Sequence, residues 1–233
     1  MTTRTKKSLF HILTEIEIKT VLVALLFLIS IFIFAYLAHE IVGENETAFD
    51  ERAFHFLSVY DSPGFIRLNR IFTFFGASYF SISAYIVLLV ILFASGRRHD
   101  GINVAIIAVT STLLMFSLKN FFHRKRPDLP LIRTLHNFSF PSGHALSSFI
   151  FCSVLAYLVW KGGLSLAWKW VLSILLTLFS LCIGISRIVL RYHYATDVIA
   201  GFCLAIAWVI LSLWIEKRLT LRRGRLALNK QHA

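Results

Sequence analysis

His193 and Asp197 have residue types and a spacing that suit a catalytic pair. Residues four apart on a helix share one face, so the Asp197 carboxylate can accept a hydrogen bond from one ring nitrogen of His193. The other ring nitrogen is then available as a base or a nucleophile. By itself, such a pair is more often a polar helix cap. The neighbouring residues therefore decide between the two interpretations.

The segment from Pro141 to His144 reads Pro-Ser-Gly-His, which is the pattern of a helix start. Ser142 is a suitable N-cap, and Gly143 would let a ligand approach the backbone closely. The free backbone N–H groups and the helix dipole at such an end attract anions. Because Pro-Ser-Gly is also ordinary turn chemistry, this segment alone is a weak indication of an anion site.

Three basic residues, Lys119, Arg126 and Arg187, lie at or just beyond the ends of apolar segments. The guanidinium fork of arginine matches the geometry of phosphate oxygens. A single cation in such a position is about as typical of a side chain that reaches toward lipid headgroups. Ionisable residues at membrane depth are nevertheless costly, and several together indicate a functional site.

The composition identifies the kind of chain that must position these residues. It is 57% hydrophobic and 15% charged, with a mean hydropathy of +0.72, whereas a soluble domain is about half apolar and about a quarter charged. This excludes a disordered chain and an ordinary soluble domain. The net charge of +12 suits nucleic acid or anionic lipid, and the apolar content favours lipid. The three cysteines, in apolar runs, predict small buried side chains rather than disulfides or a zinc site.

Six segments are long and apolar enough to cross a bilayer, which takes about 20 helical residues. They are 20–41, 74–94, 102–122, 142–160, 168–188 and 195–215. We therefore expect an all-α, six-span transmembrane helix bundle that forms a single domain over 1–233. The first segment lacks a good cleavage site, so we expect it to be retained. Apolar residues within the connection 40–72 predict a short interfacial helix there.

Basic residues are distributed unevenly between the two membrane sides. The side with both termini holds 14 of the 24 Lys and Arg residues but only 4 of the 12 Asp and Glu residues. Cytoplasmic loops carry the excess of Lys and Arg. We therefore expect a multi-pass protein of the cell (inner) membrane. The N-terminal tail 1–19 and the basic C-terminal tail 216–233 are then cytoplasmic, and the polar span ends lie on the extracytoplasmic face.

With all spans antiparallel, the candidate catalytic and phosphate-binding residues meet at that face. In the sequence they belong to three motifs. These resemble the signature motifs of the type-2 phosphatidic acid phosphatase superfamily, a family of integral-membrane lipid phosphate phosphatases. All eleven fixed positions match, in the family's order and span context. The motifs are Lys119-x6-Arg126-Pro127, Pro141-Ser142-Gly143-His144 and Ser186-Arg187-x5-His193-x3-Asp197.

The resemblance implies a role for each matching residue. His193 would attack phosphorus and form a phosphohistidine, Asp197 would orient His193, and His144 would act as general acid and then as general base. The phosphate oxygens would be bound by Lys119, Arg126, Ser142, Gly143 and Arg187. The resemblance also implies a six-helix bundle with an extracytoplasmic site and no metal or other cofactor.

Residues in the variable stretches are harder to assign. His123, Arg124 and Lys125 lie inside the first motif, and we interpret them as solvated charges that face headgroups. For Arg191 and Tyr192, substrate contact and interfacial packing are equally supported. His136 and Asn137 precede the second motif and would line the access to the site.

The sequence therefore predicts hydrolysis of a terminal phosphate from a membrane lipid phosphate or diphosphate. The substrate candidates are a polyprenyl diphosphate, phosphatidylglycerol phosphate, phosphatidate and a glycolipid phosphate, because the site residues meet only the shared phosphate. Two alternatives remain: a phosphotransferase with the same intermediate, and a non-catalytic lipid-phosphate binder or transporter. Membrane lipids are the expected partners and nucleic acid is not; the sequence does not indicate an oligomeric state.

Overall fold

The computed structural model describes residues 3–43, 48–127, 130–131 and 137–231, with side chains described from 18 to 41 and up to 222 in the first and last helices. Every regular element in these ranges is an α-helix, which confirms the all-α prediction. His136 lies outside the described residues. The helices are α1 (Thr3–Gly43), α2 (Ala48–Ser58), α3 (Pro63–Phe75), α4 (Ser78–Ala94), α5 (Arg98–Phe122), α6 (Gly143–Lys161), α7 (Leu166–Val189) and α8 (Ala195–Gln231).

Five helices are individually long and apolar enough to span a membrane: α1, α5, α6, α7 and α8. Helices α3 and α4 together qualify as a sixth, broken span, with a bend of 46° between them. The predicted segment 74–94 thus begins inside α3 and is interrupted at Gly76. The sequence pattern missed this break because both halves are apolar, and hydropathy does not register a change of direction.

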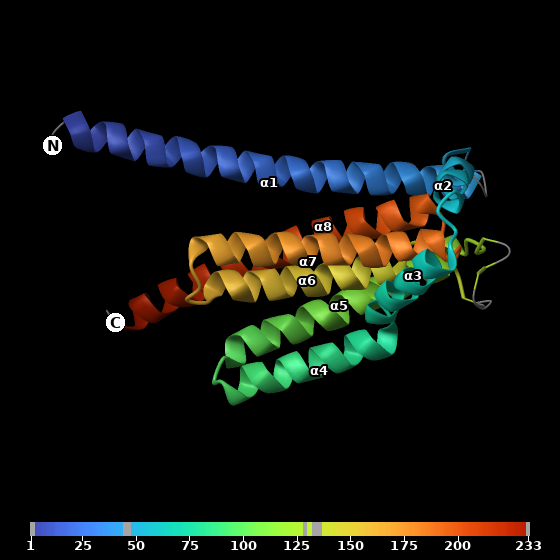
Figure 1. The fold of residues 1–233 in the computed structure, drawn as a ribbon. Coiled ribbons are helices and arrows are strands. Elements are labelled where there is room, and N and C mark those ends of the chain that lie inside the picture. Colours follow the sequence, from blue (N-terminus) through green and yellow to red (C-terminus); the bar gives the residue numbers. More distant parts are fainter. Residues whose placement is uncertain (1–2, 44–47, 128–129, 132–136, 232–233) are drawn as a thin grey trace.

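The last three spans, α6, α7 and α8, are joined by short connections and run antiparallel to one another, as expected (Figure 1). In Figure 1, α6, α7 and α8 lie together in the bundle, α1 lies along α8, and α4 and α5 form a hairpin on the opposite side. Helix α1 begins and α8 ends at the same end of the bundle. Both helices continue beyond the expected spans, so the described parts of the tails 1–19 and 216–233 are helical.

The predicted interfacial helix is present as α2, at the end of the bundle where α1 finishes (Figure 1). Its inner face is apolar: Phe54 and Leu57 pack against a buried cluster that includes Ile188 and Val198. Phe56 faces outward and is exposed. Helix α2 is therefore fixed to α7 and α8 on one face and available to the membrane interface on the other.

Candidate active site

The site lies in a cavity of about 620 Å³ where the ends of α5, α6 and α7 meet the turn before α8. Helices α3 and α4 form the opposite wall, and their residues at the break contribute to the lining. Six of the eight residues expected from the sequence line it: Lys119, Arg126, Gly143, His144, Arg187 and His193. Ser142 and Asp197 are fully buried outside this lining.

His193 and Asp197 form the expected pair. The Nδ1 atom of His193 lies 3.3 Å from Oδ2 of Asp197, which also accepts a hydrogen bond of 3.0 Å from the Tyr194 N–H. The other ring nitrogen, Nε2, lies 3.2 Å from Nη1 of Arg126. A guanidinium can only donate, so Nε2 must be the acceptor and Nδ1 must carry the proton. His193 thus presents an unprotonated nitrogen to the cavity.

The surroundings of His193 favour its neutral form. The His193 side chain is 2% exposed, and burial lowers its pKa well below the usual value. The positive charges of Arg126, Lys119 and Arg187 lower the pKa further. A cationic pocket therefore keeps the histidine neutral while it attracts an anion.

Arg126 is held by the loop that leads into α6 and by the turn before α8. Its Nε and Nη2 atoms donate to the carbonyl and side-chain oxygens of Asn137, at 2.8 and 2.7 Å. Its Nη1 atom donates to the carbonyl of Tyr192. Burial lowers the pKa of Arg126 to about 10, so it remains charged at neutral pH. Asn137, expected at the access to the site, lines the cavity and also orients Arg126.

Lys119 and Arg187 approach the cavity from different helices. Lys119 is buried near the end of α5, and its Nζ donates to the carbonyls of Phe138 and Ser139 at 2.7 and 3.2 Å. Arg187, near the end of α7, donates to Oγ1 of Thr73 at 2.6 Å, and its Cζ lies 4.1 Å from the Tyr192 ring centre. The backbone and side-chain acceptors thus fix both cations at the cavity wall.

The start of α6 has the predicted cap. The Ser142 hydroxyl accepts from the Ala145 N–H at 3.5 Å, so it serves the helix and faces away from the cavity lining. Gly143 does line the cavity, and a Cβ there would lie 2.6 Å from Sδ of Met115. The close approach of α5 therefore explains the glycine. The phosphate contact expected for Ser142 remains a prediction.

His144 lies at the break between α3 and α4. Its imidazole is hydrogen-bonded to the backbone of Thr73. A Cβ at Gly76 would lie only 2.7 Å from Cδ2 of His144 and 2.5 Å from Cγ2 of Ile183. Neither Thr73 nor Gly76 was a candidate from the sequence. The Thr73 backbone holds the His144 imidazole, and the missing side chain of Gly76 leaves the space that this imidazole occupies.

The interpretation of Arg124 as a solvated charge was wrong. Its guanidinium is buried and forms ion pairs of 3.0 Å with Asp50 and 2.6 Å with Asp197. It also donates to Oγ1 of Thr196 at 2.8 Å. The physical reason is that α2 and α8 cover this residue with acceptors. His123 and Lys125, by contrast, are exposed as expected.

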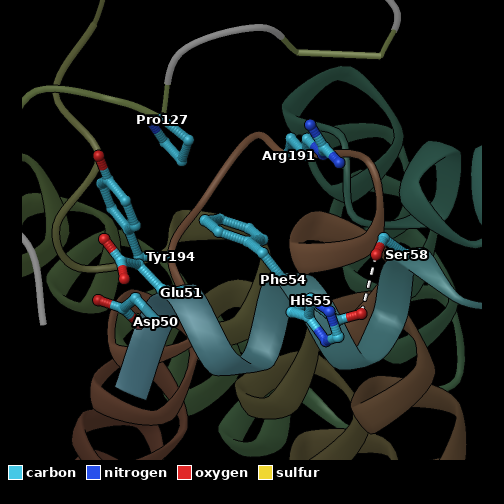
Figure 2. Close-up of a pocket in the computed structure, with 8 residues that line it drawn as sticks. All are labelled: Asp50, Glu51, Phe54, His55, Ser58, Pro127, Arg191 and Tyr194. Carbon is cyan, nitrogen blue, oxygen red and sulfur yellow. Dashed lines mark hydrogen bonds between the residues drawn. The ribbon is translucent and has the colours of Figure 1, made fainter. Parts of the chain in front are cut away.

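Arg191 and Tyr192 face different cavities. Tyr192 lines the active-site cavity, whereas Arg191 lines a second cavity of about 390 Å³ beside α2 (Figure 2). Figure 2 shows Glu51, Phe54 and His55 of α2 on one side of this second cavity. Arg191 therefore does not line the cavity that holds the predicted site residues.

The active-site cavity is lined by cations and histidines and by no Asp or Glu among the described residues. The described part of the chain has one group of acids and histidine spaced for a metal, formed by His99, Asp100 and Glu216. It lies at the opposite span ends, and Asp100 there is paired with Arg97 and Lys161. The residues around His193 are thus suited to an anion rather than to a divalent cation.

The chain is similar in sequence and in structure to known proteins. The chain is 28% identical to phosphatidylglycerophosphatase B of Bacillus subtilis (strain 168) over 158 residues, which are 65% of this chain and 77% of the relative. The structure resembles the transmembrane PAP2-type phosphatidylglycerolphosphate phosphatase of Bacillus subtilis, with a TM-score of 0.73 and 26% identity, over 82% of this chain and 96% of that chain.

A second solved structure, Aquifex aeolicus LpxE, is similar with a TM-score of 0.59 and 28% identity, over 72% of this chain and 97% of that chain. Residues 100–221 match the family model of the PAP2 superfamily. This range contains all three motifs, together with α6, α7 and most of α5 and α8. The chain therefore belongs to the PAP2 superfamily.

Proposed function

We propose that the protein hydrolyses a terminal phosphate from a membrane lipid phosphate or diphosphate, without a metal, through a phosphohistidine on His193 at the extracytoplasmic face. The observation that carries the proposal is the state of His193. Its Nε2 atom is an acceptor that faces a cationic cavity, and its Nδ1 atom lies 3.3 Å from the Asp197 carboxylate. A neutral, oriented imidazole is what nucleophilic attack on phosphorus requires.

In the first step, the Nε2 lone pair of His193 forms a bond to phosphorus while the bond from phosphorus to the lipid oxygen breaks. His144, which must carry a proton once the phosphate dianion occupies the cavity, transfers that proton to the lipid oxygen. The phosphate takes the place of the present contact between Nε2 and Arg126. Lys119, Arg126 and Arg187 then stabilise the charge on the phosphoryl oxygens.

In the second step, water attacks the phosphohistidine. His144, now neutral, accepts a proton from that water, and the nitrogen–phosphorus bond breaks to release inorganic phosphate. Asp197 supports the imidazole in both steps because its carboxylate holds the proton on Nδ1. Each residue returns to its starting state, so one phosphate is released per turnover.

A lipid substrate is supported by the rest of the cavity. From the cations the lining continues between α4 and α5, past Ile82, Met115 and Phe116. Met115 and Phe116 belong to α5, which is apolar enough to span a membrane, and Ile82 belongs to the broken span that α3 and α4 form together. A lipid whose phosphate is bound at Lys119 would therefore place its acyl or prenyl chain along α4 and α5, toward the bilayer.

The experiment is phosphate release by the detergent-solubilised protein in the presence of EDTA. The substrate panel should contain phosphatidylglycerophosphate, the substrate class named for the Bacillus subtilis relatives, together with phosphatidate and a polyprenyl diphosphate. Release of inorganic phosphate without an acceptor lipid distinguishes a hydrolase from a phosphotransferase. Binding without phosphate release would contradict the proposal.

A further inference from the structure

Three buried side chains of opposite charge type form a connected network behind His193. The Arg124 guanidinium joins the Oδ2 atom of Asp50 at 3.0 Å to the Oδ1 atom of Asp197 at 2.6 Å. The side chains of Asp50 and Asp197 are 0% exposed and that of Arg124 is 1% exposed. Ionic hydrogen bonds at such sites are stronger than neutral ones because water does not compete.

Arg124 restricts the orientation of the Asp197 carboxylate. One oxygen of Asp197, Oδ2, faces His193 and the Tyr194 N–H, and the other, Oδ1, accepts from Arg124. With both oxygens engaged, rotation of the carboxylate would break an ionic contact. The direction from which Asp197 meets the imidazole thus depends on the position of Arg124.

Asp50 restricts Arg124 and the start of α8 at the same time. Its Oδ1 atom accepts from the Thr196 N–H at 2.9 Å, and its Oδ2 atom accepts from the Thr196 hydroxyl at 2.7 Å. The same hydroxyl oxygen accepts from Nη1 of Arg124 at 2.8 Å. Asp50 of α2 therefore supplies a carboxylate to the first turn of α8, where a negative charge is favourable.

Arg124 also contacts an aromatic side chain, which further restricts its position. Its Cζ atom lies 4.0 Å from the centre of the Tyr194 ring, and that ring contacts Phe54 of α2. Figure 2 shows Asp50 and Phe54 on α2 beside Tyr194. The guanidinium is thus enclosed by α2 and by the turn that carries His193.

We propose that Asp50 is a positioning residue for the catalytic pair, acting through Arg124 on Asp197, so that α2 is part of the catalytic apparatus. This inference rests on the proposed function. Neither Asp50 nor Arg124 lines the active-site cavity, so neither meets the phosphate. The loss of Asp50 should therefore slow the chemical step and leave substrate binding unchanged.

The test is Asp50→Asn, with Glu51→Gln as the matched control. Glu51 is the next residue on α2, is exposed, and carries the same charge. Loss of a partner that orients a metal-ligating side chain typically costs about 10- to 100-fold, and we take the same scale for the partner of Asp197. We expect kcat to fall by about this factor in Asp50→Asn, with KM and vanadate inhibition as in the wild type, and Glu51→Gln to retain the wild-type kcat.

Arg124→Lys and the double variant Asp50→Asn/Arg124→Lys test whether Asp50 acts through Arg124. Lysine keeps the charge but cannot join two carboxylates in the same fork geometry. We expect a similar fall in kcat for the single variant and little further fall in the double variant. Independent, multiplicative effects would overturn the inference.

Thr196→Val provides a second measurement should Asp50→Asn fail to fold. It removes the hydroxyl that bridges Asp50 and Arg124 and leaves the direct ion pair between them in place. We expect kcat to fall several-fold at unchanged KM. An unfolded Asp50→Asn protein together with wild-type kcat in Thr196→Val would assign Asp50 a purely structural role. If the wild type forms a phosphohistidine but Asp50→Asn has wild-type kcat, this inference fails and the proposed function stands.

Discussion

Replacement of Gly76 by alanine should damage catalysis through His144 while the fold is retained. A Cβ at this position would lie 2.7 Å from Cδ2 of His144 and 2.5 Å from Cγ2 of Ile183. Carbon atoms in contact lie about 3.5 to 4.0 Å apart, so each neighbour must move by about 1 Å. The backbone itself accepts alanine, because Gly76 has an ordinary φ of −91°.

A displacement of about 1 Å in a catalytic group can cost about 100-fold in rate. We therefore expect kcat of Gly76→Ala to fall by about two orders of magnitude. The assay is phosphate release at saturating substrate, with the elution profile and thermal unfolding in detergent as measures of folding. The control is Gly64→Ala on the same helix, where a Cβ would meet nothing within 4 Å.

Wild-type kcat in a folded Gly76→Ala protein would refute the reasoning, because His144 would then tolerate the displacement. A comparable loss in Gly64→Ala would also refute it, since the effect would then follow from an alanine at either end of α3 and not from the contact with His144. A loss confined to Gly76→Ala supports the placement of His144 at the reacting oxygen.

Three further predictions concern pH, metals and sidedness. The lowered pKa of His193 means that its neutral form persists to lower pH, so the acidic limb of kcat/KM should lie below about 6.5, the ordinary histidine value. Arg126→Gln removes the strongest of the charges that lower this pKa, so the limb should move to higher pH, whereas Lys125→Gln should leave it in place. Activity should survive EDTA and be inhibited by vanadate; loss on chelation with recovery on Mg²⁺ addition would contradict the mechanism. In intact cells without native cysteines, a cysteine at Asp61 should react with an impermeant maleimide and one at Ser165 only after permeabilisation; the reverse would place the site in the cytoplasm.

Much of the candidate site could be predicted from the sequence because its residues are related by short spacings. His193 and Asp197 lie four apart, and the Pro-Ser-Gly-His segment marks the start of α6. Hydropathy likewise located the spans, since each span is a continuous stretch of apolar residues in the sequence. These features are local, so they could be recognised before the structure was known.

The features that the sequence did not predict depend on tertiary packing. Asp50 and Arg124 are 74 residues apart, and nothing near either one indicates the other. A basic residue near a span end gives the same sequence pattern whether it faces headgroups or a buried acid, so Arg124 was misinterpreted. Gly76 is similar: its importance follows from His144 and Ile183, which approach it from two other helices.

The most direct test of the account is to identify the phosphorylated residue. Rapid quenching of the wild type with a labelled lipid phosphate, under alkaline conditions that preserve phosphohistidine, should trap one phosphoryl group, and mass spectrometry should assign it to His193. His193→Ala should fold in detergent, trap no label and release no phosphate. Asp197→Asn should be slower by about 10⁴-fold, as expected when the supporting carboxylate of a triad is lost. Label on another residue, or phosphate release by His193→Ala at the wild-type rate, would contradict the central claim.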